Sequence, residues 1–264
     1  MNSRSMSSKA LNGNSRWRIG LISDLHGNVI ALQAVLDALD KLGIDQLLCM
    51  GDVVTAGPNP TETVALLREQ RCPVVMGNTD AWALDPTPFA YRNEETAIVY
   101  AIELWGAQQL SDEDRAFLRG FVPTIHLDLG AATILCYHGS PRSNLENIRS
   151  TTPDAELDVI FAGHSATVAI GGHTHTQMVR RYQEMLIVNP GSAGAPVSFA
   201  RGAARALYPP WAEFGLLEVA NTPLGPTLQV QLHRTPIPVD DVIAAAKASG
   251  MPHADWYISH WQID

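Results

Sequence analysis

Short polar motifs along the chain carry residue types that bind metal ions. Their side chains provide two carboxylates, one carboxamide and four imidazoles, from Asp24, His26, Asp52, Asn78, His138, His173 and His175. Oxygen and nitrogen donors without a thiolate suit Mn²⁺, Fe, Zn²⁺, Co²⁺ or Ni²⁺ rather than a structural zinc site built from cysteines. Seven ligands are too many for one transition ion, but they fit two ions that share a carboxylate.

The motifs follow segments that we expect to be strands. Apolar runs at 17–23, 46–50, 72–76, 132–137 and 168–171 each end just before one of the motifs. Ligand sites in open α/β sheets collect outside the carboxyl ends of strands, so these side chains are expected to converge. Glycines next to the motifs let the backbone turn sharply and bring a carboxylate or imidazole close to an ion.

The order of the elements that must position these motifs predicts an α/β fold. Apolar residues at helical spacing predict helices at 30–42, 61–70, 96–109, 111–119 and 239–249, with Gly43 ending the first and Ser111 capping the fourth. Residues 81–95 are predicted to be a loop. A hairpin is expected around Gly130, and strand-like runs recur at 177–188, 213–219 and 227–233. Strands and helices that alternate and then give way to strands predict a parallel-rich half followed by an antiparallel-rich half.

Composition limits the kinds of partner. The 264 residues carry a formal charge of −9, which argues against extended contact with nucleic acid or anionic lipid. No apolar run approaches the roughly 20 residues needed to span a bilayer. Three widely spaced cysteines favour reduced thiols and a cytoplasmic protein. We expect a disordered leader at 1–16 and a single domain at 17–264.

The motifs SDLHGN, GDVV, GNTD, HGSP and GGHTH resemble, in this order, the signature of the calcineurin-like metallophosphoesterase superfamily. The resemblance spans residues 19 to about 196. Two further stretches, GDVVTAGPNP and VNPGSAGAP, are similar to the compact bacterial and archaeal phosphodiesterase branch. The implied fold is a four-layer α/β/β/α sandwich with mixed sheets.

The same resemblance implies how the ligands are shared between two divalent cations, of which Mn²⁺ is the first expectation. One metal would be held by Asp24, His26, Asp52 and His175, and the other by Asp52, Asn78, His138 and His173. Asp52 would bridge the two, and a hydroxide between the ions would be the nucleophile. The residues expected to be catalytic are Asp52, Asn78 and His138.

One position departs from the family pattern. Many relatives have a histidine after Gly-Asn that is thought to protonate the leaving group, whereas this chain has Thr79. A threonine hydroxyl is too weak an acid for this role near neutral pH. We therefore expect activated leaving groups, another proton donor or slow turnover. The predicted substrate contacts are Thr79, Arg142 and Arg92, and residues 81–95 are either a surface loop or a lid.

Two functions from different classes follow. The first is an enzyme that hydrolyses a small phosphodiester, or alternatively a phosphomonoester. Its substrate could be derived from a nucleotide, and the chain could form homo-oligomers. The alternative is a protein-binding scaffold with weak or lost catalysis, as in the retromer subunit of this family. All seven ligand positions are retained, which favours the enzyme, and Thr79 favours the scaffold.

Overall fold

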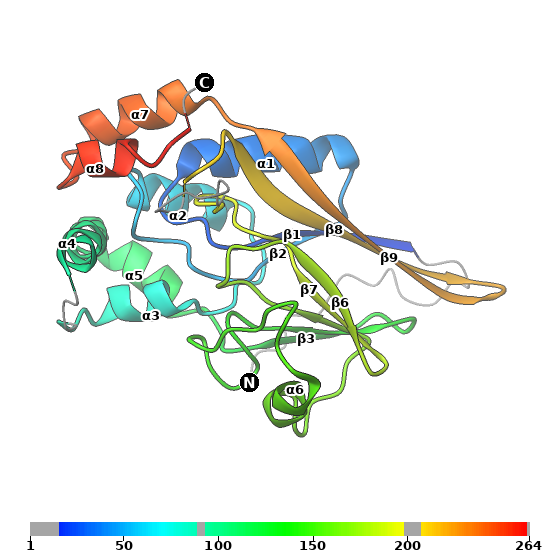
Figure 1. The fold of residues 1–264 in the computed structure, drawn as a ribbon. Helices are drawn as coiled ribbons and strands as arrows, with labels where there is room; N and C mark the ends of the chain where they lie inside the picture. Colours follow the sequence, from blue (N-terminus) through cyan, green and yellow to red (C-terminus); the bar gives the residue numbers. More distant parts are fainter. Residues whose placement is uncertain (1–15, 89–92, 198–206, 263–264) are drawn as a thin grey trace.

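Two mixed β-sheets lie face to face at the centre of the computed structural model, which describes residues 16–88, 93–197 and 207–262 (Figure 1). Their strand orders are β2-β1-β8-β9 and β3-β4-β5-β7-β6. The strands are β1 (Arg16–Ile22), β2 (Gln46–Cys49), β3 (Ile125–Asp128), β4 (Thr133–Cys136), β5 (Val168–Ile170), β6 (Met178–Tyr182), β7 (Met185–Asn189), β8 (Trp211–Thr222) and β9 (Gly225–Pro236).

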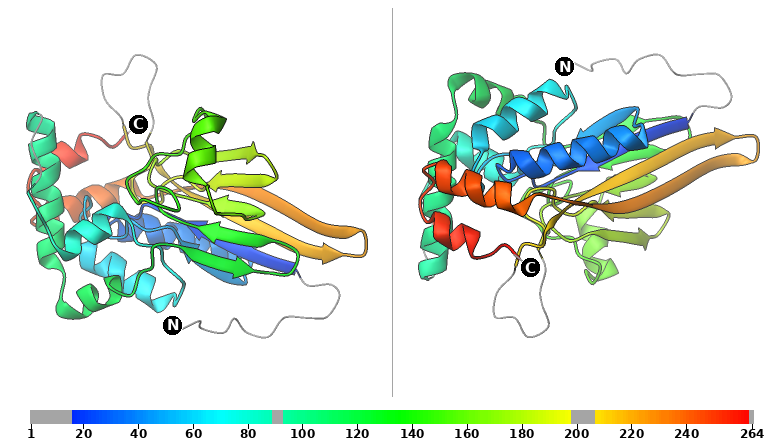
Figure 2. Two further views of the ribbon diagram at one scale, coloured as in Figure 1. Left: turned by 90° about the horizontal axis from the view of Figure 1, so that it is seen from below. Right: turned by 90° about the horizontal axis from the view of Figure 1, so that it is seen from above.

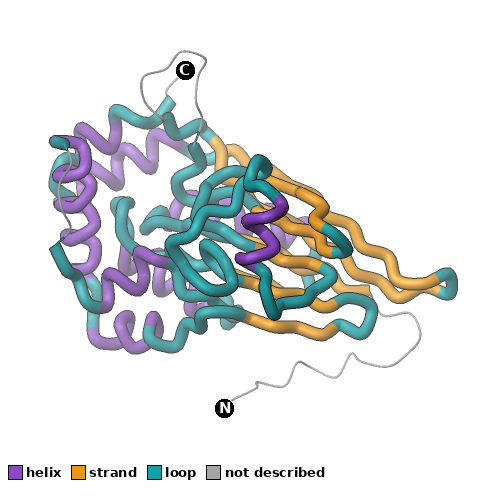
Figure 3. The backbone as a smooth tube through the Cα atoms, turned by 60° about the horizontal axis from the view of Figure 1, so that its bottom comes forward, coloured by secondary structure: helices purple, strands orange, loops and turns teal. Residues whose placement is uncertain are grey.

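Parallel pairs occupy the part of each sheet that leads into the polar motifs. β1 pairs with β2 in parallel, and β5 pairs in parallel with both β4 and β7. Antiparallel pairs join β1 to β8, β8 to β9, β3 to β4 and β6 to β7. The loops after β1, β2, β4 and β5 carry most of the candidate ligands. Figure 3 shows the loops gathered between the helical part of the molecule and the strands.

Some helices cover the outer faces of the two sheets, and others lie beside the sheets at one end of the molecule (Figure 1). They are α1 (Val29–Leu42), α2 (Pro60–Glu69), α3 (Asn78–Leu84), α4 (Glu94–Gln109), α5 (Asp112–Leu118), α6 (Asp154–Ile160), α7 (Val239–Ala248) and α8 (Ala254–Ile258). In Figure 1, α1, α2 and α7 lie above the sheet that contains β1, and α6 lies below the other sheet. Figure 2 shows the β8–β9 hairpin extending beyond the rest of the fold.

Three apolar cores separate these layers. Leu21 and Leu48 of one sheet and Ile134 and Ile170 of the other are buried in the core between the sheets. A second core joins the first sheet to α1, α2 and α7, and a third joins the second sheet to α6. Burial of this apolar surface is the main force that stacks the layers. The predicted four-layer α/β/β/α sandwich is confirmed.

Several predicted elements are confirmed. Helix α1 ends at Gly43, which adopts φ 66° in the left-handed region that glycine tolerates. Ser111 caps α5, because its hydroxyl accepts a hydrogen bond from the Asp114 N–H. The predicted hairpin is β3 and β4, and the strand-like run at 177–188 is the β6–β7 hairpin.

Other predictions are wrong. Residues 72–76 make only isolated bridges, Cys49 to Val74 and Val75 to Val122, and no strand. The expected loop at 81–95 includes the end of α3 and the start of α4. Helices α6 and α8 were not expected. Residues 1–15 of the predicted leader, and Arg92, lie outside the described residues.

Candidate metal centre

The backbone at the candidate ligands is unusual. Five of the seven have a positive φ in the left-handed region: Asp24 (56°), His26 (46°), Asp52 (54°), His173 (66°) and His175 (53°). Such residues cost free energy and collect where function requires a particular side-chain direction. The sharp turns after β1, β2 and β5 thus direct these side chains into one region instead of continuing each strand.

One group of candidate ligands joins the loop after β1 to the loop after β5. Ligand atoms of Asp24, His26 and His175 all lie within 4.8 Å of one another. His175 Nε2 is 3.3 Å from Asp24 Oδ1 and 3.0 Å from His26 Nε2. Asp24 is fully buried, and His26 is 7% exposed. These three side chains form a compact O/N donor set.

A second group joins the loops after β2, β4 and β5. Ligand atoms of Asp52, His138 and His173 also lie within 4.8 Å of one another. His138 Nε2 is 3.3 Å from Asp52 Oδ2 and 3.0 Å from Asn78 Oδ1. The Asn78 carboxamide therefore faces the same space, and its role as a ligand stays a prediction.

Asp52 connects the two groups. Its Oδ2 is 3.3 Å from His138 Nε2 in the second group and 3.8 Å from His26 Nε2 in the first. Its Oδ1 accepts a hydrogen bond of 2.9 Å from the Thr79 N–H. The structure therefore brings all seven predicted ligands together, with Asp52 between the two groups.

Two imidazoles have their outward nitrogens fixed by main-chain carbonyls. His138 Nδ1 lies 2.7 Å from the Met50 carbonyl, and His175 Nδ1 lies 2.7 Å from the Ala195 carbonyl. A carbonyl only accepts, so each Nδ1 carries a proton, and in the neutral imidazole each Nε2 presents a lone pair toward the centre. Metal-binding histidines usually have this second hydrogen bond.

The donor atoms of the two groups fit divalent cations, because several of them are acceptors that face one another. In the neutral state, the Nε2 lone pair of His138 faces oxygens of Asp52 and Asn78 that also only accept. The Nε2 lone pair of His175 likewise faces the Asp24 carboxylate. Acceptors that face one another repel unless a proton or a cation lies between them. A cation at each group would satisfy all of these atoms.

The electrostatics of the metal-free centre follow from burial and close pairing. Burial lowers the pKa of His138, but the Asp52 carboxylate, with smaller contributions from Asp24 and the Met50 carbonyl, raises it to about 10. Burial raises the pKa of Asp52, but the charge and hydrogen bond of His138 hold it below its ordinary value. Burial and the neighbouring His175 lower the pKa of His26 to about 4. Without metal, a proton on His138 therefore takes the place of a cation.

Neighbouring segments position the ligand loops, and sequence reasoning assigned them no such role. The Asp80 carboxylate accepts hydrogen bonds from the Val53, Val54 and Gly77 N–H groups, which ties α3 to the loop after β2. A Cβ on Gly77 would lie 2.2 Å from the Asp52 nitrogen, so only glycine permits this approach.

The stretch at 189–195 supports the loop after β1. The Ser192 hydroxyl and the Gly194 N–H both donate to the Asp24 carbonyl, and the Asn28 side chain donates to the Gly194 carbonyl. The Ala195 carbonyl then fixes His175. The sequence signal for this support was the run VNPGSAGAP, which is rich in the small residues that close backbone approach requires.

The predicted substrate contacts differ in what surrounds them. Thr79 is buried, and its hydroxyl donates to the Val54 carbonyl at 3.4 Å. The Arg142 guanidinium forms an ion pair with Glu146 and donates to the Val159 carbonyl. Arg142 is thus engaged within the protein, and its contact with phosphate stays a prediction.

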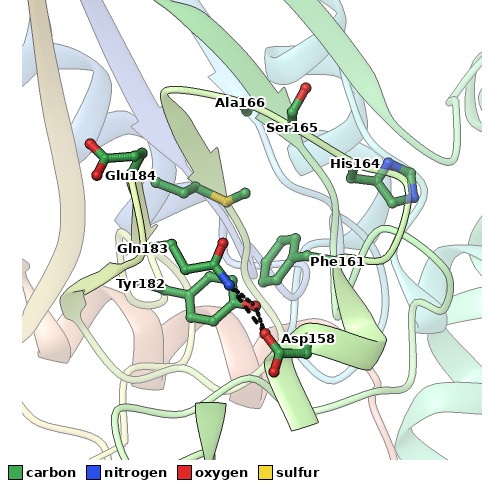
Figure 4. Close-up of a pocket in the computed structure, with 9 residues that line it drawn as sticks. Asp158, Phe161, His164, Ser165, Ala166, Tyr182, Gln183 and Glu184 are labelled. Carbon is green, nitrogen blue, oxygen red and sulfur yellow. Dashed lines mark hydrogen bonds between the residues drawn. The ribbon is translucent and has the colours of Figure 1, made fainter. Parts of the chain in front are cut away.

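A surface pocket lies where β5 and β7 begin, at the strand ends opposite the ligand loops (Figure 4). Tyr182 and Gln183 donate there to the Asp158 carboxylate, and His164 lines the same pocket. His164 belongs to neither ligand group. Within the described residues, no helix is long and apolar enough to cross a membrane.

Comparison with known proteins decides the family. The model of the calcineurin-like phosphoesterase superfamily domain matches residues 17–207. The chain belongs to this superfamily. A curated relative, an uncharacterized protein of Methanocaldococcus jannaschii, is 31% identical over 190 residues, which cover 67% of this chain and 76% of that protein.

Solved structures agree with this calcineurin-like phosphoesterase fold. A metallophosphoesterase from Sphaerobacter thermophilus is similar with a TM-score of 0.70 and 26% identity, covering 93% of this chain and 99% of that one. A hypothetical protein from Pyrococcus horikoshii has a TM-score of 0.71 and 20% identity, covering 92% and 96% respectively. The second likeness supports the fold alone.

Proposed function

We propose that this chain is a dinuclear metal-dependent phosphoesterase that hydrolyses a small phosphodiester. The observation that carries the proposal is the position of Asp52 Oδ2, 3.3 Å from His138 Nε2 and 3.8 Å from His26 Nε2. A carboxylate between two groups of histidine and carboxylate ligands is what two cations acting on one phosphoryl group require. Membership of the phosphoesterase superfamily supports the reaction class.

The residues have the following roles in this proposal. One cation would be held by Asp24, His26 and His175, the other by Asn78, His138 and His173, and Asp52 would be shared by both. When bound, the cations supply Lewis-acid charge for the phosphoryl oxygens and a water of lowered pKa. The carbonyls of Met50 and Ala195 keep His138 and His175 in the tautomer that binds metal.

The substrate class follows from charge and resemblance. A net charge of −9 disfavours an extended nucleic acid, whereas a small phosphoester can bind where cations reverse the local field. The diester is preferred to the monoester because GDVVTAGPNP and VNPGSAGAP resemble the phosphodiesterase branch. Mn²⁺ as the native ion and a cytoplasmic location stay predictions.

The direct test is hydrolysis of bis(4-nitrophenyl) phosphate by the purified protein with Mn²⁺. The isosteric variant Asp52→Asn removes the bridging charge and keeps the side-chain size. We expect its kcat/KM to fall by about 10³-fold or more, since charge stabilisation supplies several kcal/mol to such reactions. Asp37→Asn is the matched control, because Asp37 lies on the exposed face of α1, where it accepts a hydrogen bond from Gln33.

Each outcome decides between the two functions. Hydrolysis by the wild type and Asp37→Asn, with loss in Asp52→Asn, supports the enzyme. Equal rates in wild type and Asp52→Asn would refute it and leave the protein-binding scaffold, the function that Thr79 favours.

A further inference from the structure

A cavity of about 250 Å³ lies beside the loop that carries His173 and His175. It is lined by residues 148–151, which lie between β4 and α6, and by residues of the segment that joins β5 to β6. Thr174 is one of these lining residues, and it stands between the two histidines in the sequence. The same short loop therefore borders both the candidate metal centre and this cavity, which we call the Arg149 cavity.

The residues that line the Arg149 cavity suit an anion. Arg149 is the one charged residue among the described residues that line it, and none of these residues has a carboxylate. Hydroxyl groups, which can donate hydrogen bonds, come from Ser150, Thr151, Thr174 and Thr176. The chain as a whole has a formal charge of −9, so a cavity with a cationic side chain and no acid stands apart from the general charge and favours a negatively charged ligand.

The Arg149 guanidinium has no partner in the part of the chain that the structure describes, where it makes neither a hydrogen bond nor an ion pair. Two other arginines of the neighbouring segments differ in this respect. Arg142 pairs with Glu146, and Arg180 pairs with Asp154. A guanidinium has five N–H donors in a planar arrangement that matches a phosphate or carboxylate. Arg149 is therefore the arginine of this region that is available to an anionic ligand.

The backbone that carries Arg149 is held in place. The Arg149 N–H donates to Thr152 Oγ1 at 2.9 Å, and the Thr152 N–H donates back to the Arg149 carbonyl at 3.1 Å. The guanidinium of Arg180, on β6, donates to three carbonyls of the same turn, those of Arg149, Ser150 and Thr152. These bonds fix the turn against β6, so less backbone freedom is lost when a ligand binds at Arg149.

The wall formed by the loop after β5 is also fixed. Asn189, which is 2% exposed, donates through its carboxamide to the Gly172 carbonyl at 2.7 Å and to the Thr174 hydroxyl at 3.1 Å. Because the Thr174 oxygen accepts this bond, its own proton stays available to another acceptor. The contacts that hold the two histidines of this loop therefore also hold one side of the Arg149 cavity.

We propose that the Arg149 cavity binds a second anionic group of the substrate, an inference that rests on the proposed phosphodiester hydrolysis. The reacting phosphodiester lies at the metal centre, next to His173 and His175. A phosphate or carboxylate elsewhere in the same molecule extends past Thr174 and pairs with the Arg149 guanidinium. The substrate class is therefore a small phosphodiester with a further anionic group, rather than a diester of two neutral alcohols.

The test measures inhibition of bis(4-nitrophenyl) phosphate hydrolysis by the full chain at a fixed concentration of free Mn²⁺. The inhibitors are alkane-α,ω-diyl bisphosphates of increasing length, and alkyl monophosphates of the same lengths report binding at the metal centre alone. A series of lengths is used because one phosphate must reach the cations while the other reaches Arg149. For the wild type we expect at least one bisphosphate to bind about 10- to 100-fold more tightly than its monophosphate, the usual contribution of a hydrogen bond to a charged group.

Substitutions of arginine assign this preference to the cavity. In Arg149→Gln the ratio of bisphosphate to monophosphate affinity should fall toward one, and Arg149→Lys, which keeps the charge, should retain part of it. The matched control is Arg181→Gln, which removes the same charge from an exposed position of β6 outside the cavity and should keep the wild-type ratio. Phosphoalkanoates of the same lengths carry a carboxylate in place of the second phosphate, and the series that shows the larger ratio identifies the anionic group.

The outcomes separate this inference from the proposed function on which it rests. If no inhibitor with a second anionic group binds the wild type more tightly than its monophosphate, or if Arg149→Gln keeps the preference, the anion site is wrong while the phosphoesterase stands. An equal loss in Arg181→Gln would likewise overturn it, because general charge and not the cavity would then explain the preference. A wild type that does not hydrolyse bis(4-nitrophenyl) phosphate would overturn both.

Discussion

At the scale of single residues, the metal-free centre is held by a charged pair. His138 has its Nδ1 proton on the Met50 carbonyl and its Nε2 beside Asp52 and Asn78, both of which accept. The Asp52 carboxylate raises the pKa of His138 to about 10 despite its burial. At neutral pH this imidazole is therefore protonated in the absence of a cation.

Metal loading should therefore release protons. A cation needs the neutral Nε2, so binding displaces the His138 proton, and the apparent affinity should rise with pH up to about pH 10. His26, with a pKa of about 4, is already neutral and contributes no proton above about pH 5. Calorimetry in buffers of different ionisation enthalpy at pH 7.5 should show at least one proton released per loaded chain. Uptake of protons, or an affinity that falls with pH, would contradict this description.

The ligand types could be predicted from the sequence because side chains that bind metal are rare in such regular contexts. Six of the seven follow strand ends and Asn78 follows the apolar segment 72–76, and the structure brings all of them together. The Met50 and Ala195 carbonyls could not be predicted, because any residue type supplies a carbonyl.

At the scale of elements, short loops with a left-handed backbone do most of the positioning. Asp80 is central to this, because its carboxylate accepts from the Val53, Val54 and Gly77 N–H groups and so joins α3 to the loop after β2. Asp80 is completely buried. Without it, these N–H groups would lose their partners in a place that water does not reach.

Replacement of Asp80 by alanine should therefore destabilise the protein. We expect the free energy of unfolding to fall by about 3 kcal/mol, since unsatisfied buried donors cost roughly 1–3 kcal/mol each and some relaxation is expected. Urea denaturation with a chelator present measures this without a contribution from metal binding. The control is Asp85→Ala, at the exposed end of α3, which should change stability by less than about 0.5 kcal/mol. Similar losses in the two variants would show that Asp80 does not hold this loop.

Elements with strong periodicity could be predicted, and those set by tertiary contacts could not. Helix α1 has buried residues at helical spacing and a glycine at its end. Helix α3 begins within Gly-Asn-Thr-Asp, where polar residues and nearby prolines indicate a loop. Residues 72–76 are apolar enough for a strand, but they make single bridges only. Their main-chain partners, not their composition, decide that outcome.

At the scale of the whole molecule, the two sheets share one centre. The loops after β1 and β2 belong to one sheet, and those after β4 and β5 belong to the other. Asp24 and Asp52 thus come from one half of the sandwich, and His138, His173 and His175 come from the other. Bound cations would therefore link the two sheets. The superfamily model matches residues 17–207, which include strands of both sheets.

The most direct measurement of this arrangement is an anomalous difference map from a crystal of the full chain soaked in Mn²⁺. Two peaks are predicted, one among Asp24, His26 and His175 and the other among Asn78, His138 and His173, with Asp52 contacting both. A single peak would contradict the dinuclear centre. The absence of any peak at these residues, from a protein that is folded in the crystal, would contradict the account as a whole.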